Sequence, residues 1–449
     1  TLEVERLDGG LRRKWSSTFQ LPEAKVDLKP TIVFRDGRPA LAFVPDLELV
    51  PGMELQAAVV REDRVLVFAS VLSSAIALVV DSRTGEIDEV TLPVAPSAGG
   101  SLGFLVSPSG SAVALAALSD DQQTLDIHHL GPALGVDWHT TLAVEKPRPG
   151  TVRGLESLAI DDLGQVYVLA GGDDATVRVR RVAAGEEREL SLATSERFLH
   201  DVRLVTRLVV PTPARTEPKS KSKGKKGKKP ATPPAAPPRV EVAVVATAGQ
   251  DRRKSRSLLH AQLDFASGAV QAGPSVLAVD LFGALDGAGW WALGQVEQLE
   301  GGDLLVAGQQ VRGADRVTRD GSPDRVDAAR GGHADTASWL GDIGVARLGA
   351  DGSRRWTHRV QTRQAGTEGR LDLAGGARAW VGSGTLDLLH VDVGAFASSW
   401  HFDEIDLSTG APIRSTNLSQ ENPASLAVRR LATRLPTGAL LTPAVTADL

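Results

Sequence analysis

Histidine and cysteine, the side chains most typical of metal and nucleophile sites, are few in this chain and are not grouped by spacing. The sequence has nine histidines and no cysteine, which excludes thiolate zinc sites, cysteine nucleophiles and a disulfide framework. His128 and His129 are adjacent, so on a strand their rings point to opposite faces and cannot chelate one ion together. The chain contains no His-Glu-x-x-His and no Gly-x-x-x-x-Gly-Lys-Ser/Thr motif. We therefore predict no catalytic, metal-binding or cofactor-binding residue, and no cofactor.

Cationic charge is concentrated in one stretch, although the formal net charge of the chain is only −5. Residues 215–229 carry a net charge of +7, so the rest of the chain carries −12. The surrounding segment 211–238 is rich in lysine and proline and has no apolar side chain larger than alanine. Such a segment cannot bury a core, and we predict a disordered insertion.

The lysine-rich segment is either a solvated tether or a contact for an acidic surface such as a polyanion. No aromatic residue is interleaved with the lysines, which argues against stacking on nucleic-acid bases. The lysines that we predict to contact an acidic partner are Lys219, Lys221, Lys223, Lys225, Lys226, Lys228 and Lys229.

One spacing recurs along the chain and indicates a repeated hairpin. A tryptophan follows a leucine by eight positions at Trp15, Trp138 and Trp356, with turn residues between the two. A fourth hairpin leads from Val182 to Leu190 with the same offset, and there leucine replaces tryptophan. We predict that Trp15, Trp138 and Trp356 pack one repeat against the next.

Related hairpins share the turn apolar-Asp-x-x-Thr/Ser-Gly, which begins at Asp81, Asp264 and Asp406. Aspartate and serine or threonine side chains bond to the local backbone, and glycine takes the positive φ that the turn needs. Upstream of most of these hairpins lies another, for example the runs that follow Gly110 and Gly164. Two successive hairpins make a four-stranded unit, which is the sheet of a propeller blade.

These units predict an all-β protein, a β-propeller of seven four-stranded blades in a single domain over residues 1–449. Residues 424–449 contain only the first hairpin of a unit and residues 1–20 contain only the second. Pairing of these two hairpins would close the ring and remove free sheet edges. Six or eight blades remain as alternatives, because residues 21–54 fit no repeat well and the region 372–418 is irregular.

The runs at 342–356 (DIGVARLGADGSRRW) and 159–171 (AIDDLGQVYVLAG) resemble bacterial seven-bladed β-propeller repeat proteins. The Asp-x-x-Thr-Gly turns are also similar to pyrroloquinoline-quinone-type propeller repeats. The resemblance implies the fold and suggests a place in the bacterial envelope or on the cell surface, but it implies no activity. Many quinone enzymes hold their cofactor with adjacent cysteines, and the absence of cysteine here weakens that enzymatic interpretation.

A second insertion, 310–341, is a long charged loop in which acids and arginines nearly balance. The repeat pattern places it between the second and third strands of its blade, so it should leave the face opposite the lysine-rich segment. Its acids lack the Asp-x-Asp-x-Asp-Gly order of a calcium loop. Trp339, at its end, is a candidate lid or interface anchor, and Trp290 of the pair Trp290-Trp291 is a second interface candidate.

The leading functional hypothesis is a non-catalytic propeller that acts as an interaction or scaffold module in a larger bacterial envelope or surface assembly. The alternatives are a polyanion-binding protein that works through the lysine-rich segment, and a propeller hydrolase or lyase with acids at the channel mouth. No apolar run approaches the ~18 residues that span a bilayer. The chain begins at Thr1, which fits a removed export signal or a trimmed start. We expect the protein in the periplasm, on the outer surface or secreted, with the cytoplasm as the alternative.

Overall fold

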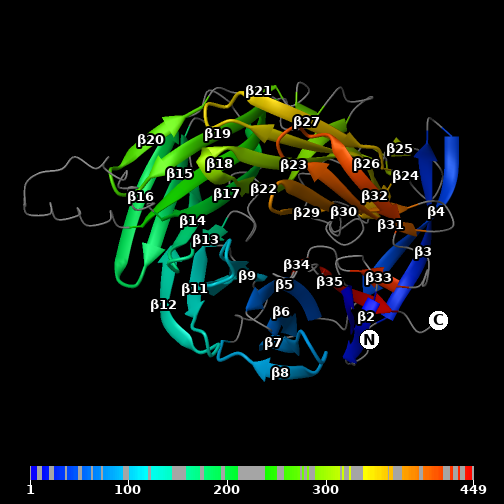
Figure 1. The fold of residues 1–449 in the computed structure, drawn as a ribbon, viewed down its shortest axis with the longest axis horizontal. Coiled ribbons are helices and arrows are strands. Elements are labelled where there is room, and N and C mark those ends of the chain that lie inside the picture. The colour runs from blue at the N-terminus through cyan, green and yellow to red at the C-terminus, as the bar shows by residue number, and fades with distance from the viewer. Residues whose placement is uncertain are drawn as a thin grey trace, which may run out of the picture.

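The protein is an all-β propeller of four-stranded antiparallel sheets (Figure 1). The computed structural model describes residues 2–7, 13–19, 25–35, 38–48, 53–61, 64–71, 74–94, 101–119, 123–143, 158–171, 176–193, 198–210, 238–249, 257–273, 276–277, 281–282, 289–313, 316–317, 323–324, 337–362, 364–367, 377–393, 398–417, 425–427, 433–434 and 440–446. No helix among these residues is both long and apolar enough to cross a membrane.

Six of the sheets are each built from one continuous segment, with strands in sequence order from the centre of the ring outward. Blade 1 consists of β5 (Met53–Arg61), β6 (Arg64–Val71), β7 (Ser74–Asp81) and β8 (Ile87–Thr91). Blade 2 consists of β9 (Ser101–Val106), β10 (Val113–Leu118), β11 (Thr124–Leu130) and β12 (Val136–Ala143). Blade 3 consists of β13 (Leu158–Ile160), β14 (Val166–Gly171), β15 (Thr176–Ala183) and β16 (Glu186–Ala193).

The remaining three blades are longer or carry additional strands. Blade 4 consists of β17 (Phe198–Val209), β18 (Arg239–Gly249), β19 (Ser257–Asp264) and β20 (Ala269–Ala272), and β21 (Val276–Leu277) pairs with β19. Blade 5 consists of β22 (Gly289–Gln298), β23 (Leu304–Gly313), β26 (Ala337–Leu348) and β27 (Arg354–Val360), and β28 (Gln364–Thr367) pairs with β26. Blade 6 consists of β29 (Ala377–Val381), β30 (Thr385–Val393), β31 (Ser398–Asp406) and β32 (Pro412–Asn417).

The two ends of the chain share a further sheet. Its order is β2 (Arg13–Phe19), β1 (Leu2–Leu7), β35 (Leu440–Thr446) and β33 (Ser425–Ala427), and β34 (Thr433–Arg434) pairs with β35. The N-terminal hairpin thus supplies two strands and the C-terminal segment supplies the others, which is the pairing that the half-repeats predict. The six continuous blades match the alternative number of six rather than seven.

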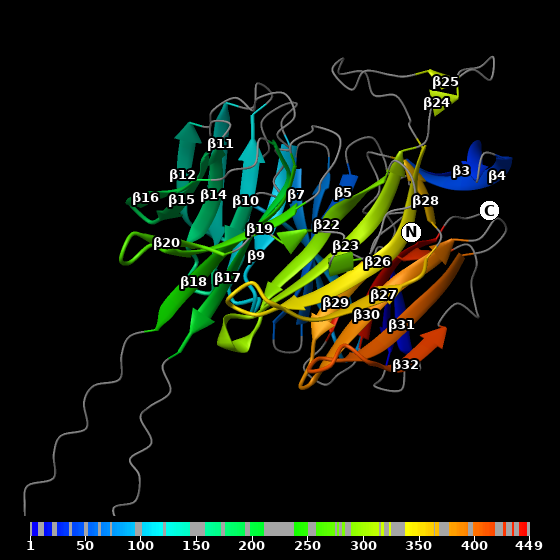
Figure 2. The same cartoon turned by 90° about the horizontal axis from the view of Figure 1, so that it is seen from above.

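The innermost strands of successive blades contact one another around the ring, from β5 through β9, β13, β17 and β22 to β29. The turns that join first to second and third to fourth strands lie on one face, which we call the turn face. The connections between second and third strands lie on the opposite face, the crossover face (Figure 2).

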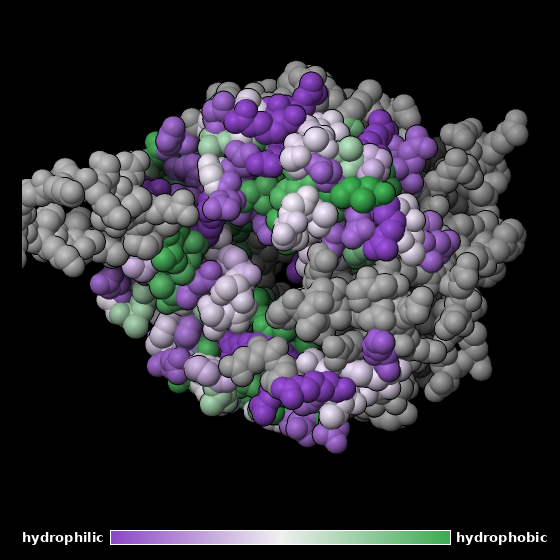
Figure 3. All heavy atoms as spheres, in the orientation of Figure 1, coloured by the Kyte–Doolittle hydropathy of each residue, from purple (hydrophilic) through white to green (hydrophobic). Residues whose placement is uncertain are grey.

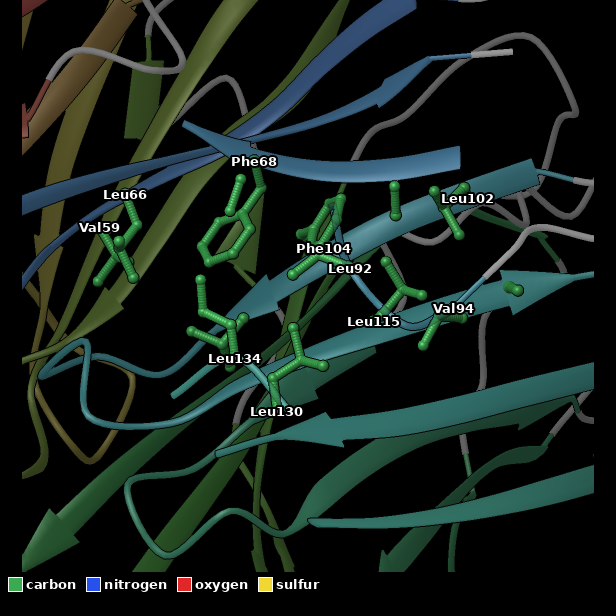
Figure 4. Packing of buried hydrophobic residues seen from close by; sticks show 14 residues of the cluster. Val59, Leu66, Phe68, Leu92, Val94, Leu102, Phe104, Leu115, Leu130 and Leu134 are labelled. Atoms are coloured by element: carbon green, nitrogen blue, oxygen red, sulfur yellow. The ribbon is translucent and has the colours of Figure 1, made fainter. Parts of the chain in front are cut away.

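The core lies between blades, because each middle strand is covered on both sides. In β10, Val113, Leu115 and Ala117 pack toward blade 1, whereas Ala114 and Ala116 pack toward blade 3. Valine and alanine suit such a strand, since a neighbouring sheet approaches each face. Figure 4 shows the cluster between blades 1 and 2, where the rings of Phe68 and Phe104 stack with centroids 4.8 Å apart.

Two regions that the sequence left irregular have defined structures. The described residues of 21–54 form a two-stranded hairpin rather than a blade: β3 (Lys25–Arg35) and β4 (Arg38–Glu48) pair at the periphery (Figure 1), and β4 contacts β28. The region 372–418, which we expected to be irregular, contains the four regular strands of blade 6.

Candidate functional site

The Asp-x-x-Thr/Ser-Gly turns have one geometry on the turn face. In each, the aspartate Oδ1 accepts the backbone N–H groups two and three residues later, and the glycine N–H donates to the carbonyl of the aspartate. The glycines Gly85, Gly268 and Gly410 have φ values of 79°, 78° and 75°. The backbone N–H groups of Thr84 and Arg83 hold the pKa of Asp81 below the usual range. The hydroxyl and N–H of Ser267 do the same for Asp264, and the Ser408 hydroxyl with the bonds from Thr409 lowers the pKa of Asp406 to about 2. Each of these carboxylates therefore has a structural role in its turn.

Two tryptophans dock on these turns from the neighbouring sheet. The indole N–H of Trp356, in β27, donates to the carbonyl of Leu407 at 2.8 Å, and that of Trp15, in β2, donates to the carbonyl of Ser82 at 3.2 Å. A Cβ on Gly410 would lie 2.7 Å from the ring of Trp356, so the glycine also makes room for the indole. Both tryptophans thus join an outermost strand to the next sheet.

Trp138 lies at the same strand position but makes a different contact. Its ring stacks on His129 with centroids 5.5 Å apart, and it packs on the apolar cluster between blades 2 and 3. His129 approaches the turn of blade 3 that contains Gly164. The neighbouring His128 instead stacks on His139, which agrees with the opposite orientation expected of adjacent strand residues.

In blade 3, Arg188 and not Leu190 takes the place of tryptophan. Trp15, Trp138 and Trp356 lie opposite Arg6, His129 and Arg347, each next to a β-bulge. Blade 3 has no bulge at this hairpin, so Arg188 lies opposite Arg181, and Leu190 lies opposite Val179. The guanidinium of Arg188 donates to the carbonyl of Phe265 at 3.1 Å. The eight-residue offset from Val182 to Leu190 was therefore misleading.

Blade 5 extends beyond the other blades on the crossover face. Antiparallel pairing continues past the ring at three strand ends, namely the start of β22, the end of β23 and the start of β26. There β28 pairs with β26 as a fourth strand. One row of this extension runs from Gly289 through Arg312 and Trp339 to Ala365. Beyond it, β24 (Arg316–Val317) and β25 (Pro323–Asp324) form a small hairpin that stands clear of the blades (Figure 2). We call β24, β25 and these strand ends the blade 5 extension.

Trp290 and Trp339 both belong to the blade 5 extension by their backbone pairing, and their side chains lie outside the described residues. Trp291 is fully buried against Phe282, as expected for one member of the tryptophan pair. Asp342, directly after the insertion, accepts from the guanidinium of Arg359 and has a structural partner.

The lysine-rich segment joins β17 to β18 on the turn face, opposite the blade 5 extension. Its seven predicted contact residues, Lys219, Lys221, Lys223, Lys225, Lys226, Lys228 and Lys229, lie outside the described residues. Their role stays a prediction.

A polar group buried between blades 5 and 6 was missed by sequence reasoning. Nε2 of His390 lies 2.7 Å from Oδ2 of Asp403, and the ring of His390 stacks on His401 with centroids 5.2 Å apart. His390 lowers the pKa of Asp403 against the opposing effect of burial. Nδ1 of His390 is buried without a partner in the described part of the chain. His390 and His401 are eleven positions apart and meet only because β30 and β31 pair, so no motif identifies them.

The geometry argues against one further chemical possibility. Residues 99–103 read Gly-Gly-Ser-Leu-Gly, which fits the Gly-x-Ser-x-Gly pattern of hydrolases. That motif needs a strand-to-helix turn, whereas Ser101 begins β9 and pairs with Leu118. No group of three or more potential metal ligands occurs among the residues that the structure describes.

No protein-family model and no curated protein sequence matches the chain. Solved structures with a distant likeness include the polysaccharide lyase Uly1 (9% identity, TM-score 0.41, 96% of this chain and 100% of that one). Others are a protein from Lactobacillus plantarum (11%, 0.43, 94% and 97%) and the Dos1 propeller (9%, 0.34, 82% and 84%). Likeness at this level transfers no activity or ligand to this chain.

Proposed function

We propose that the protein is a non-catalytic propeller that acts as an interaction or scaffold module in a larger assembly of the bacterial envelope or surface. The observation that carries the proposal is the blade 5 extension, in which β22, β23, β26 and β28 continue past the ring and present a hairpin above the crossover face. A rigid sheet that holds a connection away from the body is suited to contact another protein. The cationic segment leaves the opposite face, which gives the scaffold two separate contact elements.

We infer in addition that the sheet shared by the chain ends is a seventh blade that closes the ring. Six residues of β1 pair with six of β35. Trp15 of this sheet docks on a turn of blade 1, as Trp356 of blade 5 docks on a turn of blade 6, and β34 contacts β5. Closure of this kind fixes the positions of the contact elements, because it leaves no free edge at which the ring could open.

The test is comparative capture of partners by two deletion variants. Replacing residues 314–336 with a short Gly-Ser linker removes the hairpin but keeps the paired ends of β23 and β26, which deletion of 310–341 would destroy. The matched control replaces residues 212–236, between β17 and β18, with the same linker. Both variants should unfold at the temperature of the intact chain.

We expect the first variant to lose a specific partner that the control retains, as identified by mass spectrometry and confirmed by reciprocal capture. Equal partner sets for the intact chain and the 314–336 variant would overturn the role of the blade 5 extension. Loss of partners only in the 212–236 variant would favour the polyanion-binding alternative instead.

A further inference from the structure

Two histidines of blade 2 face each other across neighbouring strands near the outer edge of the ring. His128 on β11 pairs directly with His139 on β12, so both side chains leave the same side of the sheet. Their rings stack with centroids 5.5 Å apart and an angle of 15° between the ring planes. Within the described residues, neither ring makes a hydrogen bond or an ion pair.

This histidine pair can be reached from solvent. His139 is exposed and His128 is half-buried. Strand β12 is the fourth strand of its blade and forms the outer edge, where hydrophilic side chains are exposed around the ring (Figure 3). A solute can therefore approach both rings without any movement of the blades.

The spacing of the rings suits two ligands of one metal ion. Imidazole nitrogens bind Zn²⁺ at about 2.0–2.1 Å, so two nitrogens that share an ion are at most about 4.2 Å apart. Parallel rings with centroids 5.5 Å apart can bring one nitrogen each within this reach by rotation about their Cβ–Cγ bonds, which is a soft torsion in histidine. The strand pairing already fixes the two side chains next to each other, so binding needs little reorganisation.

The charges around the pair favour a bound cation. Burial, and then the nearby His139, lower the pKa of His128, so its ring is neutral at pH 7 and has a lone pair to offer. Asp126 lies two residues earlier on the same side of β11 and partly opposes that shift, which places a negative charge beside the pair. The hydroxyl of Thr141, opposite Asp126 on β12, donates to Oδ1 of that carboxylate at 2.5 Å and holds it in place.

A second stacked histidine pair, in blade 6, differs at its nitrogens. His390 and His401 also face each other across two strands, with ring centroids 5.2 Å apart. Nε2 of His390 is bonded to Asp403, however, and Nδ1 is buried, so His390 offers no nitrogen to an ion from solvent. Stacking alone therefore does not make a metal site, and access to the nitrogens separates the two pairs.

We propose that His128 and His139 form a binding site for a divalent transition-metal ion at the outer edge of blade 2. One nitrogen of each imidazole binds the ion, and water takes the remaining positions. Imidazole nitrogen suits Cu²⁺, Ni²⁺ and Zn²⁺, whereas Mg²⁺ and Ca²⁺ prefer oxygen ligands. Asp126 is not a ligand in this arrangement, but its charge attracts the cation. The spacing of the histidines in the sequence does not reveal the pair, because only strand pairing brings His139 to His128.

The experiment is isothermal titration of the full chain with Cu²⁺, Ni²⁺ and Zn²⁺, with Mg²⁺ as the oxygen-preferring probe. We expect Cu²⁺ to bind most tightly and Mg²⁺ not to bind. His128→Gln and His139→Gln should each weaken Cu²⁺ binding by at least about tenfold, since the loss of a ligand costs no less than the loss of a group that orients one. Electron paramagnetic resonance of the Cu²⁺ complex should show two coupled nitrogens in the intact chain and at most one in either variant.

His401→Gln is the matched control, because it removes one ring of the blade 6 pair. It should leave Cu²⁺ binding unchanged. Without metal, His139→Gln should unfold at the temperature of the intact chain, since His139 is exposed, so a loss of binding in this variant cannot come from misfolding. Three results would overturn the proposal: Cu²⁺ binding that both blade 2 variants retain, an equal loss of binding in His401→Gln, or binding of Mg²⁺ as tight as that of Cu²⁺.

Discussion

The indole N–H of Trp356 reaches 2.8 Å from the carbonyl oxygen of Leu407, across the seam between blades 5 and 6. Trp15 makes the equivalent bond to Ser82, and Arg188 makes it to Phe265. The acceptor in each case is the residue that directly follows the aspartate of an Asp-x-x-Thr/Ser-Gly turn. The aspartate binds the N–H groups farther along the turn, so this carbonyl is left for a donor from the next sheet. The turns therefore join neighbouring blades, and that role accounts for their recurrence.

We predict that Trp356→Phe lowers the free energy of unfolding by about 1–2 kcal/mol, because it removes the N–H donor and part of the buried ring. Urea titration followed by circular dichroism measures the change. Trp138→Phe is the matched control, since the ring of Trp138 stacks on His129 and its indole makes no hydrogen bond to another described residue. The loss for Trp138→Phe should be the smaller one, and equal losses would contradict the importance of the indole bond.

Substitution of the turn glycines separates backbone strain from the room that the indole needs. Gly268 and Gly410 have φ values of 78° and 75°, but a Cβ on Gly268 would meet nothing within 4 Å, whereas one on Gly410 would lie 2.7 Å from Trp356. Gly268→Ala should lower the free energy of unfolding by about 1–2 kcal/mol, because alanine is strained in the left-handed conformation. Gly410→Ala should cost about 1–3 kcal/mol more, because the indole must move. If the two variants lose equal stability in thermal or urea unfolding, the indole of Trp356 moves aside without cost.

Local patterns in the sequence predicted the fold well because each blade repeats the same turn and strand chemistry. The hairpins that follow Asp81, Asp264 and Asp406, and the pairing of the chain ends, depend on such local signals. The offset at Val182 did not identify the docking residue because a β-bulge adds a residue to the three tryptophan hairpins, and a bulge is decided by pairing that the spacing does not show. The range 310–341 was interpreted as a loop, although its two ends pair as continuations of β23 and β26.

The candidate sites were much harder to predict, because their members meet only through tertiary contacts. His390 and Asp403 come from two strands that pair in blade 6, and neither belongs to a motif. The unusual feature of His390 is that its ring is buried while Nδ1 has no partner in the described part of the chain, and burial can be seen only once the blades are packed around the ring.

Arg188 gives a test of the corrected docking position in blade 3. Arg188→Met should lower the free energy of unfolding by about 0.5–1.5 kcal/mol, because it removes the donor to Phe265 while keeping the aliphatic stem. Arg414→Met is the control, since Arg414 is bonded to a carboxylate within its own blade. It should change stability by less than Arg188→Met, as is usual for a surface pair. If Arg188→Met has no effect in urea titration, Arg188 does not replace tryptophan energetically.

The carboxyls of Glu297 and Asp406 should make stability depend on pH in opposite directions. Burial raises the pKa of Glu297 in the folded protein above its ordinary value of 4.5. The fold therefore favours the protonated acid, and stability from this group is complete below pH 4.5 and is lost as the pH rises through the raised pKa. We predict that the stability of Glu297→Gln relative to the intact chain increases from acidic to neutral pH. Urea titrations at a series of pH values measure the difference.

Asp406 provides the contrasting case, because its turn bonds lower its pKa to about 2 from an ordinary value of 3.8. Its contribution is present above pH 3.8 and is lost as the pH falls toward 2, since protonation removes the bonds that the carboxylate accepts. Asp406→Asn should therefore be destabilising at neutral pH, and the difference from the intact chain should shrink as the solution is acidified. If both variants shift in the same direction across this range, the burial of Glu297 does not control its titration.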